Sequence, residues 1–109
     1  NKFVYSQRYL RGMIVKNLKE LTTTKGALFY QSQLRFVHCA SCEVIGKWAF
    51  SDCHQLVNFV CKKLKKIEEK GFICCYSLRN IDVKGVEVLG KQAFAKCKSL
   101  CQLQFDKLK

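Results

Sequence analysis

Apolar residues recur along this chain with a period of 22 positions. Three segments, at residues 49–56, 71–78 and 93–100, share the order small–Phe–x–x–Cys–x–x–Leu. A fourth copy at 27–34 keeps the apolar positions and lacks the cysteine. The copy before it lies 24 residues earlier in the chain instead of 22. The repeat anchors fall near positions 4, 28, 50, 72 and 94, which gives about four and a half copies. Because a repeat of this length is typical of a stacked repeat protein, we treat residues 1–109 as one domain.

After its leucine, each copy continues as Leu–x–x–apolar–x–apolar. The last two apolar positions alternate with an exposed one, and such alternation predicts a short strand with one buried face. A turn and a brief helical or 3₁₀ segment around each Ala–Phe pair would return the chain to the next strand. One unit cannot bury its own apolar face, whereas stacked units can. The pattern therefore predicts an α/β solenoid with a single parallel sheet of about five short strands and short helical, 3₁₀ or irregular segments on its convex side.

A longer element narrows the class of solenoid. The order Ile–Gly–x–x–Ala–Phe–x–x–Cys–x–x–Leu spans residues 45–56, and the same order with Leu89 in first place spans 89–100. This element resembles the BspA-like class of leucine-rich repeats, which is found in surface proteins of some bacteria and of parasitic protists. The resemblance covers roughly residues 3–109, although the middle copy has Glu68 where the early glycine stands.

The resemblance implies a right-handed leucine-rich-repeat solenoid that serves as a binding or adhesion scaffold and has no active site. It implies no particular ligand, because members of the class bind different things. Both ends of the apolar pattern lack polar caps, and uncapped ends expose core residues. We therefore expect a longer array, of which this chain is a piece, or end-to-end self-association.

One pair of cysteines is a candidate site. Cys39 and Cys42 form a C–x–x–C motif beside His38, which taken alone suggests half a zinc site or a redox pair. The repeat places both cysteines in core positions, where a thiol behaves as a small hydrophobe. We therefore favour structural thiols and expect no metal and no cofactor. A disulfide between Cys39 and Cys61 on adjacent strands stays open.

The other cysteines bear on the compartment. Cys53, Cys75 and Cys97 form a column, one per repeat, that should lie in the core. Cys74 and Cys101 fall outside the core pattern and should be partly exposed, and exposed thiols favour a reducing compartment such as the cytoplasm. The chain opens with no signal peptide, while the family resemblance points to the cell surface. Localisation therefore stays open.

The outward positions of the expected strands line one broad face. Three arginines share its first column, and aromatic and aliphatic residues lie near its middle. Arginine and aromatic residues are enriched at protein-binding hot spots, so we interpret this face as a ligand-binding patch; an ordinary solvated sheet face accounts for the same residues. The candidate ligand-binding residues are Arg11, Arg35, Phe36, His38, Val57, Asn58, Val60, Arg79, Asn80 and Asp82.

The chain is strongly basic, with 20 lysines and arginines against 8 acidic residues and a net charge of +12. Such a charge attracts polyanions weakly and in a salt-dependent way. The densest basic run consists of Lys62, Lys63, Lys65 and Lys66. A run of this kind usually forms a solvated face, so polyanion binding through these lysines is the alternative rather than the leading hypothesis.

Catalytic and membrane functions find no support in the sequence. The acidic residues form no catalytic pair, no glycine-rich phosphate loop is present, and a Cys53–His54 dyad would place its nucleophile in a core position. His38 and His54 have no carboxylate partner at a recognisable spacing and are expected to be surface histidines. The longest stretch without charge, residues 26–34, is too short to span a membrane.

The sequence therefore predicts a non-enzymatic protein-binding module that holds its ligand on the exposed strand face. Cell-surface adhesion follows from the resemblance. An intracellular scaffold that recruits partners and a basic polyanion-binding module are the alternatives.

Overall fold

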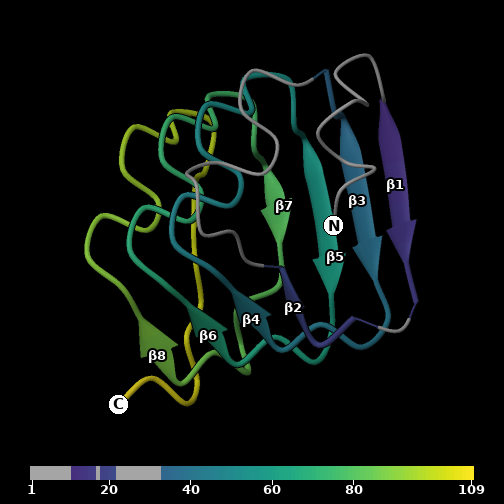
Figure 1. Ribbon diagram of the computed structural model, residues 1–109. Helices are drawn as coiled ribbons and strands as arrows, with labels where there is room; N and C mark the ends of the chain where they lie inside the picture. The colour runs from purple at the N-terminus through teal and green to yellow at the C-terminus, as the bar shows by residue number, and fades with distance from the viewer. Residues whose placement is uncertain (1–10, 17, 22–32) are drawn as a thin grey trace.

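The computed structural model describes residues 11–16, 18–21 and 33–109, which wind as a parallel β-solenoid (Figure 1). The coils before the last one contribute short strands to two separate four-stranded sheets. The first sheet has the order β1(Gly12–Val15), β3(Phe36–Cys39), β5(Asn58–Cys61) and β7(Asn80–Ile81). The second sheet has the order β2(Glu20–Leu21), β4(Val44–Ile45), β6(Lys66–Ile67) and β8(Val88–Leu89).

Strand pairing follows the sequence repeat. From β3 onward, paired residues in the first sheet are 22 positions apart, as in Phe36 opposite Asn58. The first step is longer in both sheets, because Gly12 lies opposite Phe36 and Glu20 opposite Val44, each 24 positions apart. The 24-residue step inferred from the apolar pattern agrees with this register. The anchors near positions 4 and 28 lie outside the described residues.

The expectation of a single sheet with about five strands was wrong. The described residues form two sheets of four strands each, and no strand follows Leu100. The second sheet escaped the sequence pattern because its strands are two residues long, which is too short to show alternation. Its buried members, such as Ile45 and Ile67, were recognised as core positions without being recognised as strands.

The expectation of helical or 3₁₀ segments, and with it the α/β description, was also wrong for the described residues, which contain no helix. Around Phe50, alternate backbone N–H groups have different partners. The Ala49 and Ser51 N–H groups donate to carbonyls three residues back, whereas the Phe50 N–H donates to the Gly71 carbonyl of the next coil, at 2.8 Å. A helix would satisfy these donors within the coil, so the coils replace it with successive tight turns that pair with their neighbours.

Left-handed backbone conformations make these turns possible. Trp48, Lys70 and Gln92 have φ between 54° and 62°, and they occupy the same position in successive coils. Asp52, Cys74 and Lys96 form a second such set, with φ of 60° each. Residues other than glycine rarely adopt this conformation, so its recurrence every 22 residues shows that the coil stack imposes it.

The core is a column of phenylalanines running along the solenoid. The rings of Phe50 and Phe72 stack with centroids 5.3 Å apart, and those of Phe72 and Phe94 stack at 5.4 Å. Phe59, from the first sheet, packs edge-on against both Phe50 and Phe72. Aliphatic residues from both sheets fill the remaining space, so one continuous core joins all described coils.

The cysteine column runs beside the phenylalanines. The Cys75 thiol donates a hydrogen bond to the Phe50 carbonyl, and the Cys97 thiol donates to the Phe72 carbonyl, both at 3.1 Å. Each sulfur therefore fills core volume and links its coil to the preceding one. This placement confirms the core position expected for the column, with Cys97 somewhat more exposed than the other two.

The C-terminal end of the solenoid leaves apolar side chains at the surface. Val88, Leu89 and Leu108 are exposed, while Leu103 and Phe105 pack only partly against the core. The expectation of end-to-end association rests on such residues and stays a prediction.

Replacing Phe72 with Ala should lower the free energy of unfolding by about 3–5 kcal/mol, because the fully buried ring contacts three other phenylalanines. Urea unfolding followed by circular dichroism measures this change. The control is Phe36→Ala, which truncates a partly exposed ring on the sheet face and should cost much less. Equal losses from the two variants would contradict the central place of the phenylalanine column.

Replacing Gly90 with Ala should destabilise the solenoid strongly, because a β-carbon there would overlap the backbone of Glu68 and Glu69 in the preceding coil. The matched control is Gly85→Ala, whose nearest contact would be the Leu64 carbonyl oxygen at 3.3 Å. We expect a large fall in melting temperature for the first variant and a clearly smaller change for the second, whose contact requires a shift of only a few tenths of an ångström. Similar melting temperatures would show that the two coils separate more easily than this contact implies.

Candidate binding face

The outward side chains of the first sheet form one surface, which we call the strand face. Its first column is aligned by backbone hydrogen bonds just before the strands: the Val57 N–H donates to the Arg35 carbonyl at 2.8 Å, and the Arg79 N–H donates to the Val57 carbonyl at 3.0 Å. The backbone of Arg35 is hydrogen-bonded to that of Arg11 in the same way. All three arginines are exposed, so the structure brings them into one column, with Val57 between Arg35 and Arg79.

One half of the strand face, over β1, β3 and the end of β5, is apolar. Ile14, Phe36 and Val60 have exposed fractions of 67%, 42% and 36%. Ile14, His38 and Val60 lie side by side in the strand register, and the Phe36 ring meets the His38 ring edge-on at 6.1 Å. A hollow of about 440 Å³ opens here between Ile14, His38 and Val60. Exposed apolar side chains of this kind form the centre of many protein contacts.

Ile14 is the most exposed of these side chains, yet sequence reasoning did not select it as a site residue. The sequence offered one signal for Ile14, which is its outward position in the first expected strand. The Phe36 ring lies across Gly12, where a β-carbon would overlap it. Gly12 therefore leaves room for the Phe36 ring in this position.

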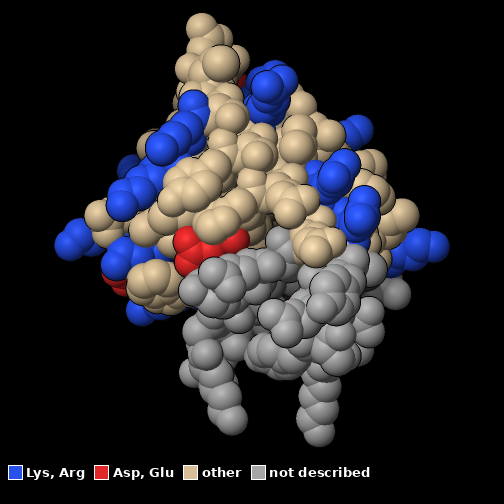
Figure 2. Space-filling model, turned by 90° about the horizontal axis from the view of Figure 1, so that it is seen from above, with Lys and Arg blue, Asp and Glu red and all other residues tan. Residues whose placement is uncertain are grey.

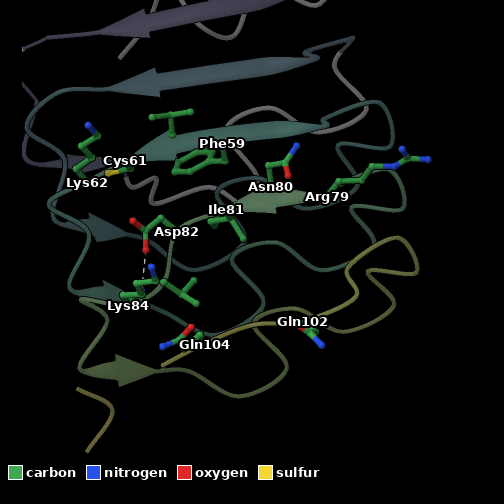
Figure 3. Close-up of a pocket in the computed structure, with 12 residues that line it drawn as sticks. Phe59, Cys61, Lys62, Arg79, Asn80, Ile81, Asp82, Lys84, Gln102 and Gln104 are labelled. Atoms are coloured by element: carbon green, nitrogen blue, oxygen red, sulfur yellow. Dashed lines mark hydrogen bonds between the residues drawn. The ribbon is translucent and has the colours of Figure 1, made fainter. Parts of the chain in front are cut away.

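The other half of the strand face is polar. The side-chain amide of Asn80 donates a hydrogen bond to the side-chain oxygen of Asn58 on the neighbouring strand. Further along the same coil, the Asp82 carboxylate accepts a hydrogen bond from the Lys84 backbone N–H at 3.0 Å. A second hollow, of about 500 Å³, lies between these residues and the last coil (Figure 3). The predicted residues therefore fall into two zones of different chemistry.

Two of the four lysines in the basic run lie beside carboxylates. Lys62 and Lys63 are exposed in the turn after β5, whereas Lys65 lies 3.9 Å from Glu43 and Lys66 lies 3.4 Å from Glu68. Viewed from above, lysine and arginine side chains occupy several separate places with uncharged residues between them (Figure 2). Partial neutralisation of the run weakens the case for a polyanion site at these four lysines.

The thiols of Cys39, Cys42 and Cys61 are buried together under the first sheet. Cys39 lies opposite Cys61 in the strand register, and the Cys61 thiol donates to the Cys42 carbonyl at 3.0 Å. Hydrogen bonds with the Cys42 and Cys61 thiols, together with burial, raise the pKa of Cys39. Among the described residues no group of His, Cys, Asp and Glu is arranged to hold a metal ion.

Both histidines are exposed, as expected. The expectation that His54 has no carboxylate partner was wrong, because its Nε2 lies 3.5 Å from an Asp52 carboxylate oxygen. The left-handed conformation of Asp52 turns the chain back and brings the two side chains together. The His54 ring also stacks on Tyr76 at 4.7 Å, outside the coil, whereas Cys53 is fully buried. The two neighbours therefore do not form a dyad.

The described part of the chain includes no helix of the length and apolar character needed to cross a bilayer.

These features define the class of the protein: a β-solenoid of stacked repeats that carries an exposed sheet face. A family model for BspA-type leucine-rich repeat regions matches residues 15–108, in six copies. The chain belongs to this family, which confirms the resemblance read from the repeats. Searches of curated proteins and of solved structures each found no match.

Alkylation with iodoacetamide should separate the cysteines by burial. Cys101 is exposed and Cys74 is partly exposed, so both should react in the native protein. Cys39, Cys42, Cys61 and Cys75 should react only after unfolding, since burial excludes the reagent and hydrogen bonding raises the pKa of Cys39 and Cys75. Peptide mass mapping measures each site.

Labelling of Cys75 in the native protein at the rate of Cys101 would contradict the buried column. Thiols that stay unlabelled in denaturant until a reductant is added would reveal disulfides.

Proposed function

We propose that this chain is a non-enzymatic protein-binding module that holds its ligand on the strand face. Family membership supports protein binding in general, because leucine-rich repeat modules generally bind proteins. The observation behind binding on the strand face is that the column of Arg11, Arg35 and Arg79 shares this face with the exposed apolar cluster of Ile14, Phe36 and Val60. Protein-binding hot spots combine arginines with a desolvated apolar centre in this way.

Two settings fit this function and require different thiol states. Adhesion at a cell surface, which the family resemblance supports, places the protein in an oxidising environment. An intracellular scaffold keeps every cysteine reduced, and the exposed Cys101 supports that setting. The alkylation experiment therefore also decides between the two.

Site-specific photo-cross-linking tests the strand face. A benzophenone side chain in place of Phe36 should cross-link a protein partner, whereas the same group at Lys47, exposed in the turns outside both sheets, should not. Equal cross-linking from both positions would contradict a specific face.

The captured partner then allows a quantitative test. Replacing Arg11, Arg35 and Arg79 together with Ala should weaken its binding at least about 10-fold, since truncating a hot-spot arginine typically costs more than about 1 kcal/mol. The control replaces the exposed Lys47, Lys91 and Lys107 with Ala, which removes the same charge elsewhere. Equal weakening by both triple variants would indicate general charge attraction, and unchanged binding in the arginine variant would exclude this face.

A further inference from the structure

The first sheet ends at β7 although the chain makes another coil. Residues 101–105 form no strand and make no backbone hydrogen bond to β7. The same coil is attached on both sides of this segment: the Phe72 N–H donates to the Ala93 carbonyl at 2.9 Å, and the Lys109 N–H donates to the Glu87 carbonyl at 2.9 Å. The last coil is therefore anchored at its two ends and separated from β7 between them.

The hollow of about 500 Å³ occupies this separation, which we call the sheet opening. Arg79, Asn80, Ile81 and Asp82 form one wall, and Gln102 and Gln104 of the last coil lie across from them (Figure 3). The opening thus has a strand edge on one side and side-chain amides on the other.

The backbone of Ile81 faces the opening. The Asn80 N–H donates to the Val57 carbonyl at 3.1 Å, on the side of β5. Successive residues of a strand direct their backbone groups to opposite edges, so the N–H and C=O of Ile81 point away from β5, and no described residue pairs with them. An open strand edge of this kind is a template for a further strand.

The charges around the opening favour an acidic ligand. Lys62, Arg79 and Lys84 line it, and Asp82 is the one acidic residue among its lining residues. The Asp82 carboxylate already accepts the Lys84 backbone N–H. Three cations against one such carboxylate leave an excess of positive charge, in a chain whose net charge is +12.

We propose that the sheet opening binds an acidic peptide in extended conformation, which adds to the edge of β7 as a fifth strand. Its backbone would pair with that of Ile81, its carboxylates would meet Lys62, Arg79 and Lys84, and the amides of Gln102 and Gln104 would bind its far edge. Residues 79–83 line the opening, so a segment of about five residues matches its length. This inference rests on the proposed function and assigns a ligand class to the polar half of the strand face.

The test uses three fluorescein-labelled decapeptides and fluorescence anisotropy. The first alternates Glu and Thr, the second has the same sequence with alternate backbone nitrogens methylated, and the third alternates Lys and Thr. We expect the first to bind and the methylated peptide to bind at least about 10-fold more weakly, because it keeps the charge and loses strand hydrogen bonds. The Lys–Thr peptide should not bind.

Each contrary result overturns the proposal. Equal binding of the methylated peptide would show that charge alone accounts for the binding. Equal binding of the Lys–Thr peptide would exclude the role of the three cations. Absence of binding by the Glu–Thr peptide would exclude the opening as a peptide site.

Variants then locate the site. Arg79→Gln combined with Lys84→Gln should weaken binding of the Glu–Thr peptide at least about 10-fold, whereas Lys47→Gln with Lys91→Gln, which removes the same charge in the turns, should change it less than about 2-fold. Equal effects of the two pairs would place the peptide elsewhere. Thermal unfolding of each variant shows that the fold is retained.

The two proposals fail separately. If the peptide does not bind and position 36 still cross-links a protein partner, the sheet opening is excluded and the strand face stands. If neither experiment gives binding, both proposals fall.

Discussion

In the described part of this protein, no coil satisfies its backbone hydrogen bonds on its own. In the turns around Phe50 and Phe72, every second N–H group donates to a carbonyl of the next coil, and the groups between them donate within the coil. This alternation accompanies left-handed conformations at Trp48 and Lys70, which a non-glycine residue avoids when alone. The cost is repaid by stacking, because an in-register neighbour both accepts the hydrogen bonds and packs a phenylalanine against the next. The fold is therefore cooperative between coils rather than within them.

Sequence reasoning succeeded where one side chain per coil decides the structure. Phe50, Phe72 and Phe94 recur at a fixed spacing, and large apolar side chains with that spacing have to meet in the core. It failed where backbone conformation and strand pairing decide the structure. Lys70 and Cys74 carry no sign of a positive φ in their chemistry, and the two-residue strands β6 and β8 are recognisable only when their partners are in place. The helical segments expected around each Ala–Phe pair were a wrong prediction for the same reason, because backbone pairing between coils decides the conformation there.

The strand face was predicted more completely than the convex side, since outward strand positions follow directly from the period of two. Its division into an apolar and a polar half was not predicted. That division follows from the outward residues of each coil, with Ile14 and Val60 on one side and Asn80 and Asp82 on the other. The repeat keeps the inward positions of the coils apolar and lets the outward positions differ, so differences between coils arise at the outward positions.

The parallel register also gives the strand face two different spacings. Along the solenoid axis, equivalent side chains such as Phe36, Asn58 and Asn80 follow one another at the distance between strands, about 4.8 Å. Along a strand, side chains on the same face are two residues apart, about 6.6 Å. A ligand that lies along the solenoid axis therefore meets side chains at a different spacing from one that lies along a strand. The spacing of the ligand's own groups thus favours one of the two orientations. Adding a coil adds one more side chain to each row along the solenoid axis and leaves the spacing along each strand unchanged. The face therefore becomes longer while the spacing of its side chains stays the same.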